Sequence, residues 1–223
     1  VLDEVGVDRP MGAGVGVPGP VDFHRGVPVS PPIMPGWDGY PVRDAVSREL
    51  GCPVVLDNDV NVLAVGEQHA GVAKGARDFL YVKIGTGIGC GIVCNGMIYR
   101  GTNGSAGDVG HICVDPAGER CHCGNQGCVE IMAAGPAIAR QGTEAANAGK
   151  SPQLAQVLAA NGVITPEDVG QASRGGDVAA NAIIKLSGKL IGQMLASVVN
   201  FFNPSHVFIA GGISQIGPMF LAS

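Results

Sequence analysis

The chain has 223 residues, of which 46% are hydrophobic and 15% charged, and its formal net charge is -5 at pH 7. This length can bury a substantial core as one large domain or two smaller ones. The acidic balance argues against the chain itself being a nucleic-acid surface. No apolar run approaches the roughly 18 residues that span a bilayer, and no signal peptide is visible, so we expect a cytoplasmic protein without a membrane partner.

Seven cysteines are an odd number, which does not suit a complete disulfide framework. Four of them, Cys52, Cys90, Cys94 and Cys113, sit in apolar sequence surroundings. This pattern indicates reduced thiols together with a metal site formed by the remaining three.

Taken in chain order, residues 1–9 suggest the end of a helix and a turn. Residues 12–21 predict a short apolar strand running into a Pro-Gly turn, where the dense glycines indicate either a ligand approach or a plain tight turn. Residues 26–37 are too rich in proline to be helical. Helical spacing over residues 41–50 ends at Gly51, a natural C-cap.

A β-type run at residues 52–56 ends in the polar string Asp57-Asn58-Asp59-Val60-Asn61. Polar residues at the carboxyl end of a strand sit where α/β folds bind ligands. An Asx turn or N-cap that opens a helix over residues 62–70 explains the same string, and both interpretations can hold together.

The strand predicted at residues 79–84 leads into the sequence G-T-G-I-G-C-G of residues 85–91, followed by a hairpin at residues 94–97. Backbone N–H groups and a threonine hydroxyl in such a loop can face an anion without obstruction by Cβ atoms. The loop is not a Walker A motif, because it lacks the G-K-S/T sequence. Glycines on both arms of a hairpin suit the phosphate loops of the actin-like phosphotransferase fold.

The remaining elements are mostly helical. Residues 131–142 predict an alanine-rich helix, and residues 143–173 are polar and helical, with an N-cap at Thr165. Residues 177–202 predict one long helix whose apolar face serves core or dimer packing, and we expect a homodimer or tetramer. A buried strand at residues 207–210 then leads to a Gly-Gly turn.

The most specific pattern lies in residues 108–130, where one histidine precedes a C-x-C-x4-C string. His111 with Cys121, Cys123 and Cys128 supplies the ligand set of a closed tetrahedral zinc site, which reads as structural because four protein ligands leave no open position. His122 is a rival ligand that points off the C-x-C turn. Buried or disulfide-bonded cysteines are the alternative interpretation.

This segment resembles the ROK family of bacterial sugar kinases and sugar-responsive transcriptional repressors. The resemblance rests on Gly110-His111 and on the string C-x-C-G-x2-G-C-x-E that ends at Glu130. It implies an α/β, actin-like ATPase (ribonuclease H-like) fold of two domains with a zinc knuckle. Residues 1–60 would be part of the small N-terminal domain, and residues 61–223 the large domain with the zinc-binding loop and the long helix.

By similarity to the family, Asp59 would be the catalytic base that takes a proton from a sugar hydroxyl. The family's sugar-binding and phosphate-binding positions fall on further residues of this sequence. The sugar contacts implied are Asn58, Asp59, Asp108, His111 and Glu130, and the nucleotide phosphate contacts are Gly85, Thr86, Gly87, Gly89, Gly211 and Gly212. A kinase of this family would also use ATP and Mg²⁺.

Kinases of the family usually carry Glu where this chain has Asp108, and the surrounding sequence resembles the repressor branch, especially actinobacterial regulators. The chain opens after the position of the D-x-G-G-T phosphate loop of the kinases and stops before the closing helices, so we expect a partial chain. We therefore expect a sugar-responsive transcriptional regulator whose winged helix, the DNA-binding part, lies upstream. The alternative is an ATP-dependent, glucokinase-like hexose kinase.

Overall fold

The computed structural model describes residues 10–31 and 34–222, so the prediction for residues 1–9 lies outside the described residues. The chain forms two compact units, each assembled from segments that are separate in sequence. The first unit comprises Val1–Tyr81, Cys90–Gly107 and Ser205–Phe208, and the second comprises Val82–Gly89, Asp108–Pro204 and Ile209–Ser223. The domain boundary expected after residue 60 stays a prediction; in this grouping the segment that follows it belongs to the first unit.

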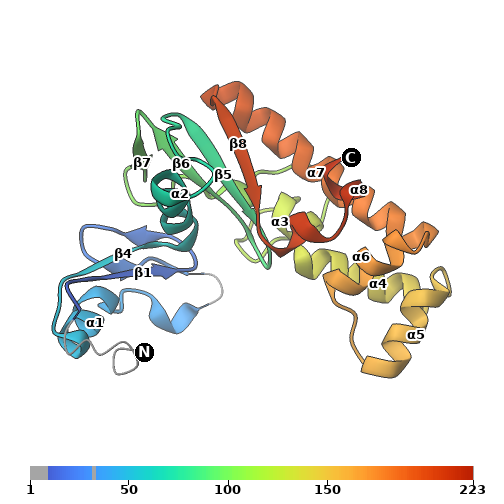
Figure 1. The fold of residues 1–223 in the computed structure, drawn as a ribbon. Coiled ribbons are helices and arrows are strands. Elements are labelled where there is room, and N and C mark those ends of the chain that lie inside the picture. The colour runs from blue at the N-terminus through green and yellow to red at the C-terminus, as the bar shows by residue number, and fades with distance from the viewer. Residues whose placement is uncertain (1–9, 32–33, 223) are drawn as a thin grey trace. The chain divides into compact units, whose positions relative to one another are not determined.

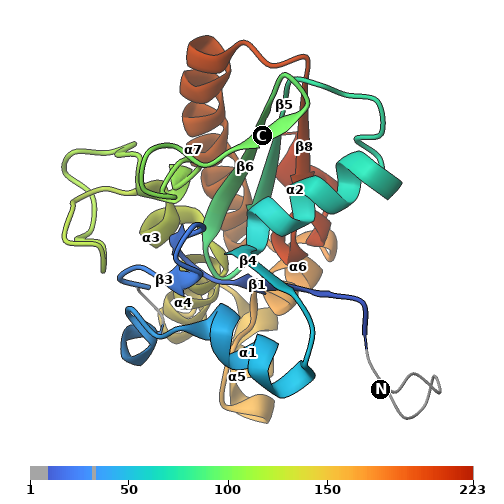
Figure 2. The same cartoon turned by 90° about the vertical axis from the view of Figure 1, so that its left-hand side faces the viewer.

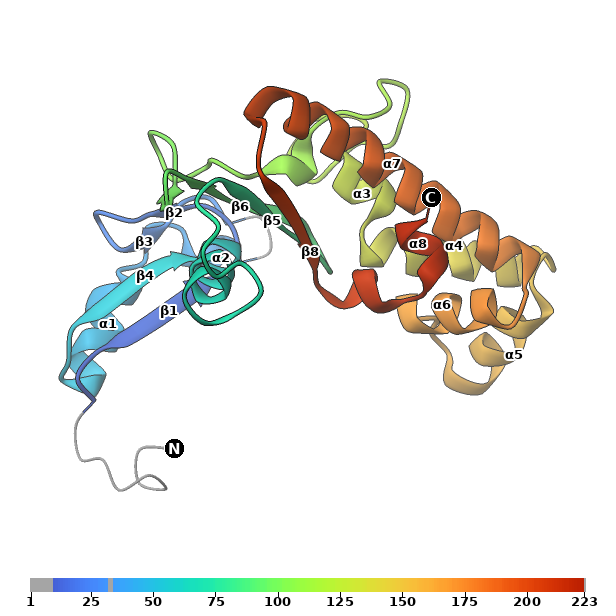
Figure 3. The same cartoon turned by 45° about the horizontal axis from the view of Figure 1, so that its top comes forward.

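The first unit is built around two parallel strands, β1 (Ala13–Val17) and β4 (Val54–Asn58), with helix α1 (Val42–Leu50) packed beside β4 (Figures 2 and 3). Its core contains buried Val17, Val21, Val42 and Leu56. Its other elements are β2 (Val21–Asp22), β3 (Val27–Pro28), the 3-10 helix η2 (Pro35–Trp37), α2 (Asp59–Ala70) and β7 (Met97–Tyr99).

Three sequence predictions in this unit are confirmed. Strand β1 lies where the apolar run was, and the described residues between Gly26 and Trp37 form the short strand β3 and the 3-10 helix η2, with no α-helix. Helix α1 ends at Gly51, which adopts the left-handed conformation with φ 61° and ψ 27°. Because a side chain is strained there, glycine is the residue that ends this helix at low cost.

Strands β5 (Phe79–Ile84), β6 (Ile88–Cys94) and β8 (His206–Ala210) form one sheet with β7, in the order β7-β6-β5-β8. The predicted hairpin is confirmed, since β6 pairs antiparallel with β7 through Cys94↔Met97. The prediction that the last strand is buried is wrong: all of its residues are at least partly exposed. The reason is its place at the edge of the sheet, where no other strand of the described residues pairs with its outer side.

The second unit is mainly helical, and helices α4, α6 and α7 pack on one another (Figure 1). Its elements are the 3-10 helices η3 (Val109–His111) and η4 (Gly212–Gln215), together with α3 (Val129–Ala133), α4 (Gly135–Asn147), α5 (Pro152–Asn161), α6 (Pro166–Arg174), α7 (Val178–Phe202) and α8 (Pro218–Leu221). The predicted N-cap at Thr165 is confirmed, because its side chain accepts from the Asp168 N–H in a capping box.

The alanine-rich segment is two helices rather than the single helix predicted. Helix α3 ends at Ala133, Ala134 is extended with ψ 174°, and α4 starts at Gly135 with Pro136 in its first turn. A proline inside a continuous helix would lack one N–H donor and would clash with the carbonyl four residues earlier. Pro136 therefore explains the break, and α3 is left as a short, separate helix.

Helix α7 is the one helix among the described residues that is long and apolar enough to cross a membrane by length and composition. In this structure its Ile183, Leu190 and Met194 are buried, and Ser187 donates a hydrogen bond of 2.7 Å to the Ala133 carbonyl. These contacts make it a packed helix of the second unit. Part of its predicted apolar face is exposed, most of all Phe201, at 92%.

Candidate functional site

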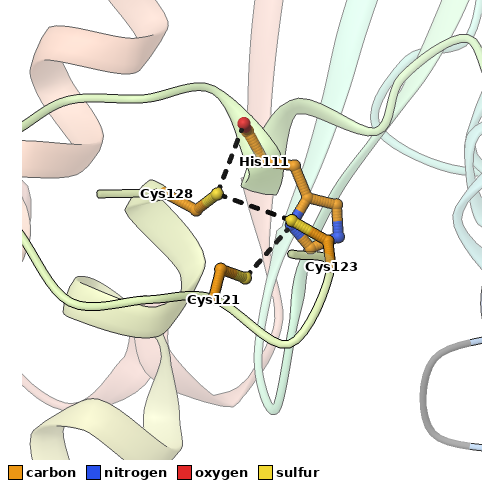
Figure 4. Close-up of side chains that lie close together, drawn as sticks. All are labelled: His111, Cys121, Cys123 and Cys128. Atoms are coloured by element: carbon orange, nitrogen blue, oxygen red, sulfur yellow. Dashed lines mark hydrogen bonds between the residues drawn. The ribbon is translucent and has the colours of Figure 1, made fainter. Parts of the chain in front are cut away.

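Three thiols and one imidazole lie together in the second unit (Figure 4). The ligand atoms of His111, Cys121, Cys123 and Cys128 all lie within 4.8 Å of one another. Cys123 Sγ is 3.7 Å from Cys128 Sγ, and His111 Nδ1 is 3.5 Å from Cys121 Sγ. These are the four ligands that the sequence predicted.

Two alternatives for this segment lose support. All seven cysteines are free thiols, so the structure contains no disulfide in this segment. His122, the rival ligand, is exposed and does not belong to the cluster.

The backbone turns sharply enough to bring the three sulfurs together because of its glycines. Gly124 and Gly127 have φ of 93° and 69°, a region that disfavours side chains. A Cβ on Gly127 would lie 1.7 Å from the Asp115 carbonyl oxygen, so no other residue fits there. The loop closes where Cys121 N–H donates to the Asn125 carbonyl at 2.8 Å.

The donor set and its spacing fit a tetrahedral metal ion. With Zn–S bonds of about 2.3 Å, two sulfurs on one tetrahedral zinc lie about 3.7 Å apart. The Cys123–Cys128 separation of 3.7 Å has this value. The cluster could therefore hold zinc through three thiolates and His111 Nδ1.

The thiols differ in how readily they ionise. Burial raises the pKa of the Cys121 thiol, and burial together with hydrogen bonds to its two neighbours raises the pKa of Cys128 to about 12. Burial acts in the same direction on Cys123, but hydrogen bonds from the Asn125 N–H and the neighbouring thiols outweigh it and lower its pKa. Cys123 is thus the thiol of the three that ionises most readily.

His111 presents its second ring nitrogen to Asp108. The Nε2 atom lies 3.8 Å from Asp108 Oδ1, and the Asp108 side chain is 48% exposed. With a metal ion on Nδ1, Nε2 would carry the proton and face the carboxylate. Asp108 and His111 thus offer an acceptor and a donor side by side.

Glu130, the other carboxylate of the predicted site, contacts the glycine loop. Its Oε2 accepts a hydrogen bond of 2.9 Å from the Ile88 N–H. The loop is shorter than predicted: β6 already begins at Ile88, so Gly89 belongs to the strand. Within the loop, the Gly85 N–H donates to the Gly87 carbonyl at 2.9 Å.

The Gly-Gly turn has a packing role. Gly211 has φ 94°, and a Cβ on it would lie 2.2 Å from the Ile84 carbonyl oxygen. Glycine is therefore required where the chain leaves β8.

In the first unit, Asn58 and Asp59 lie at the junction between β4 and α2. Asn58 is the N-cap of α2: its Oδ1 accepts from Val60 N–H and Asn61 N–H. Its Nδ2 donates to the Gly19 carbonyl at 2.9 Å. The helix therefore starts at Asp59, three residues earlier than predicted, and the N-cap interpretation is confirmed.

Two residues that the sequence did not single out support this junction. Asp57 is only 5% exposed, and its Oδ2 accepts from Arg100 Nε at 2.9 Å and lies 2.8 Å from Arg100 Nη2. Its Oδ1 accepts from Asn58 N–H and from Asn61 Nδ2. The Arg100 guanidinium lies 3.8 Å from the centre of the Phe23 ring. Asp57 and Arg100 are 43 residues apart, so no local pattern could have paired them.

Comparison with known proteins identifies the family. A family profile described as the ROK family matches residues 6–223. The chain belongs to the ROK family. Over 212 residues it is 38% identical to a glucokinase of Halalkalibacterium halodurans, covering 95% of this chain and 64% of that protein. It is 32% identical over 212 residues to a xylose repressor of Caldicellulosiruptor bescii, covering 95% of this chain and 52% of the repressor.

A solved structure gives the same fold. The ROK glucokinase of Streptomyces griseus, in complex with glucose and AMPPNP, matches 98% of this chain and 70% of that one at 34% identity, with a TM-score of 0.86. The predicted mixed α/β, actin-like fold is therefore confirmed. Since the chain spans 64% of the H. halodurans glucokinase, it represents only part of such a protein's length.

Proposed function

We propose that this protein binds a sugar through polar side chains around His111. The observation that carries the proposal is the orientation of His111, whose Nδ1 faces the cysteine cluster and whose Nε2 faces Asp108. A metal-held imidazole beside a carboxylate supplies a fixed donor and a fixed acceptor, and a sugar hydroxyl needs both. The further sugar contacts that we propose are Glu130, Asn58 and Asp59.

Zinc is the metal that we propose for the cluster. Its role would be structural, because four protein ligands leave no open position for a substrate. It would hold His111 and the start of α3 rigidly, so that the sugar contacts are ordered before the sugar binds. We further propose a homo-oligomer in the cytoplasm.

For the whole protein we propose a sugar-responsive transcriptional regulator. Asp108 supports this proposal, because its side chain is one methylene shorter than the glutamate that kinases of the family usually carry, and it reaches less far toward a sugar. DNA would be the partner of an upstream winged helix. The similarity to the xylose repressor over 95% of this chain supports the same proposal.

An ATP-dependent hexose kinase is the second candidate, supported by Asp59, the glycine loop and the similarity to glucokinases. In that case Asp59 would accept the proton of the attacking sugar hydroxyl. The amides of Thr86 and Gly87 would face a nucleotide phosphate, with Gly85, Gly89, Gly211 and Gly212 shaping the site around it. ATP and Mg²⁺ would supply the transferred phosphoryl group and neutralise its charge.

One experiment on the intact protein separates these candidates. ADP release is measured with ATP, Mg²⁺ and a panel of hexoses, and sugar binding is measured by calorimetry on the same samples. Turnover on one sugar makes the protein a kinase. Sugar binding without turnover supports the regulator, with binding to DNA from its own upstream region as the next test. A protein that binds no sugar in the panel contradicts the proposal.

A further inference from the structure

The glycine loop is held from the side by a carboxylate on helix α3. Ile88 is only 3% exposed, and its N–H donates to Glu130 Oε2 at 2.9 Å. A buried backbone N–H without a partner is costly, because it has lost its hydrogen bonds to water. Glu130 therefore satisfies a donor of the loop itself, whether or not a ligand is present.

The neighbouring glycines fit closely around this carboxylate. A Cβ on Gly87 would lie 2.8 Å from Glu130 Oε2. A Cβ on Gly110 would lie 3.0 Å from the same oxygen and 2.4 Å from the Ile88 carbonyl oxygen. The carboxylate is thus enclosed between the glycine loop and η3, where only glycines leave room for it.

The other end of the contact is anchored to the cysteine cluster. Glu130 lies in the first turn of α3, and Cys128 is the N-cap of that helix. The Val129 N–H donates to the Ile112 carbonyl at 3.0 Å, next to His111. A second bond, from Gly135 N–H to the Gly85 carbonyl at 2.8 Å, holds the start of the loop to α4.

We infer that Glu130 is a positioning residue for the loop of residues 85–88, in addition to its proposed contact with sugar. One carboxylate oxygen, Oε2, is committed to the loop, so a ligand that meets this side chain would meet the other oxygen, Oε1. A ligand bound to Oε1 would then alter the hydrogen bond between Oε2 and the Ile88 N–H, because both oxygens belong to the same carboxylate. The inference rests on the proposed function only for the identity of the ligand that the loop binds. The position of the loop itself can therefore be tested without sugar or nucleotide.

The test is amide hydrogen exchange of Ile88, followed by NMR on the intact protein labelled with ¹⁵N-isoleucine. Ile184, buried in α7, serves as the internal reference for global unfolding. Glu130→Ala should speed exchange at Ile88 by about tenfold or more relative to Ile184, since a charge-assisted bond is lost. Glu130→Gln keeps an oxygen at the same reach, so its exchange should stay within about threefold of the native protein. Glu130→Asp is too short and should behave like Glu130→Ala.

The expected ranking of the exchange rates among these variants separates a hydrogen bond that positions the loop from a purely electrostatic effect of Glu130. If charge alone mattered, Glu130→Asp would resemble the native protein and Glu130→Gln would resemble Glu130→Ala, which would overturn the inference. Unchanged exchange in Glu130→Ala would overturn it as well. Glu119→Gln is the matched control: this exposed carboxylate pairs with Arg140, away from the loop, and its loss should leave Ile88 unchanged.

A second pair of variants keeps the test decisive if Glu130→Ala does not fold. Gly87→Ala crowds the flexible end of the Glu130 side chain and should speed exchange at Ile88. Gly85→Ala meets nothing within 4 Å and should leave that exchange unchanged. Equal exchange in the two alanine variants would contradict the inference.

Discussion

Replacing Arg100 by alanine tests whether the junction that carries Asn58 and Asp59 depends on a buried ion pair. The variant removes both guanidinium contacts to Asp57 Oδ2, at 2.9 and 2.8 Å, and leaves Oδ1 with its two donors. Breaking a buried pair costs about 3–5 kcal/mol, because the remaining charge is left uncompensated. The Arg100 side chain is 27% exposed, so water can reach the site and the lower end of that range applies. Loss of the contact with Phe23 adds about 0.5 kcal/mol.

We therefore expect Arg100→Ala to lower the free energy of unfolding by about 3.5 kcal/mol. For a chain of this size that corresponds to a fall in Tm of roughly 7–14 °C. Urea unfolding and calorimetry measure the two quantities. Arg100→Lys should recover part of the loss, because it restores the charge without the planar, two-pronged contact. Glu119→Gln, which removes an exposed ion pair, should cost less than about 1 kcal/mol. If Arg100→Ala costs no more than this control, the reasoning is refuted.

The remaining predictions concern the cluster and the proposed base. Cys123→Ala should weaken zinc binding by more than about 100-fold, since even the loss of a residue that only contacts a metal ligand costs roughly 10- to 100-fold, and it should weaken sugar binding as well. Cys113→Ala, outside the cluster, should change neither affinity. Unchanged sugar affinity by calorimetry in the zinc-free Cys123→Ala variant would contradict the proposed role of the cluster. Because burial raises the pKa of Cys128 to about 12, its thiol holds a proton at neutral pH that zinc must displace. Zinc affinity measured with a competing chelator should therefore rise between pH 6 and pH 8, and a flat profile would count against thiolate ligation. Asp59→Asn should abolish any ADP release while sugar stays bound, and full activity in this variant would exclude Asp59 as the base.

Local sequence patterns predicted the elements whose causes are themselves local. The C-x-C-x4-C string with its glycines predicted the cluster, because short spacings and left-handed glycines restrict where three sulfurs can lie. Gly51 predicted the end of α1, and Thr165 predicted the start of α6, because caps act within one helical turn. The break between α3 and α4 has a local cause as well, because Pro136 cannot continue the backbone hydrogen bonds of a helix.

Tertiary structure alone decided the contacts that support the candidate site. The pairing of Asp57 with Arg100 and of Glu130 with Ile88 joins residues 43 and 42 positions apart, and nothing in either neighbourhood specifies the partner. The exposure of β8 likewise depends on its place at the edge of the sheet, not on its apolar sequence. The sequence by itself therefore determined which groups are present and which short segments hold them. Only folding, which brings distant segments together and removes them from water, decided which of those groups are satisfied by a partner and which remain for a ligand.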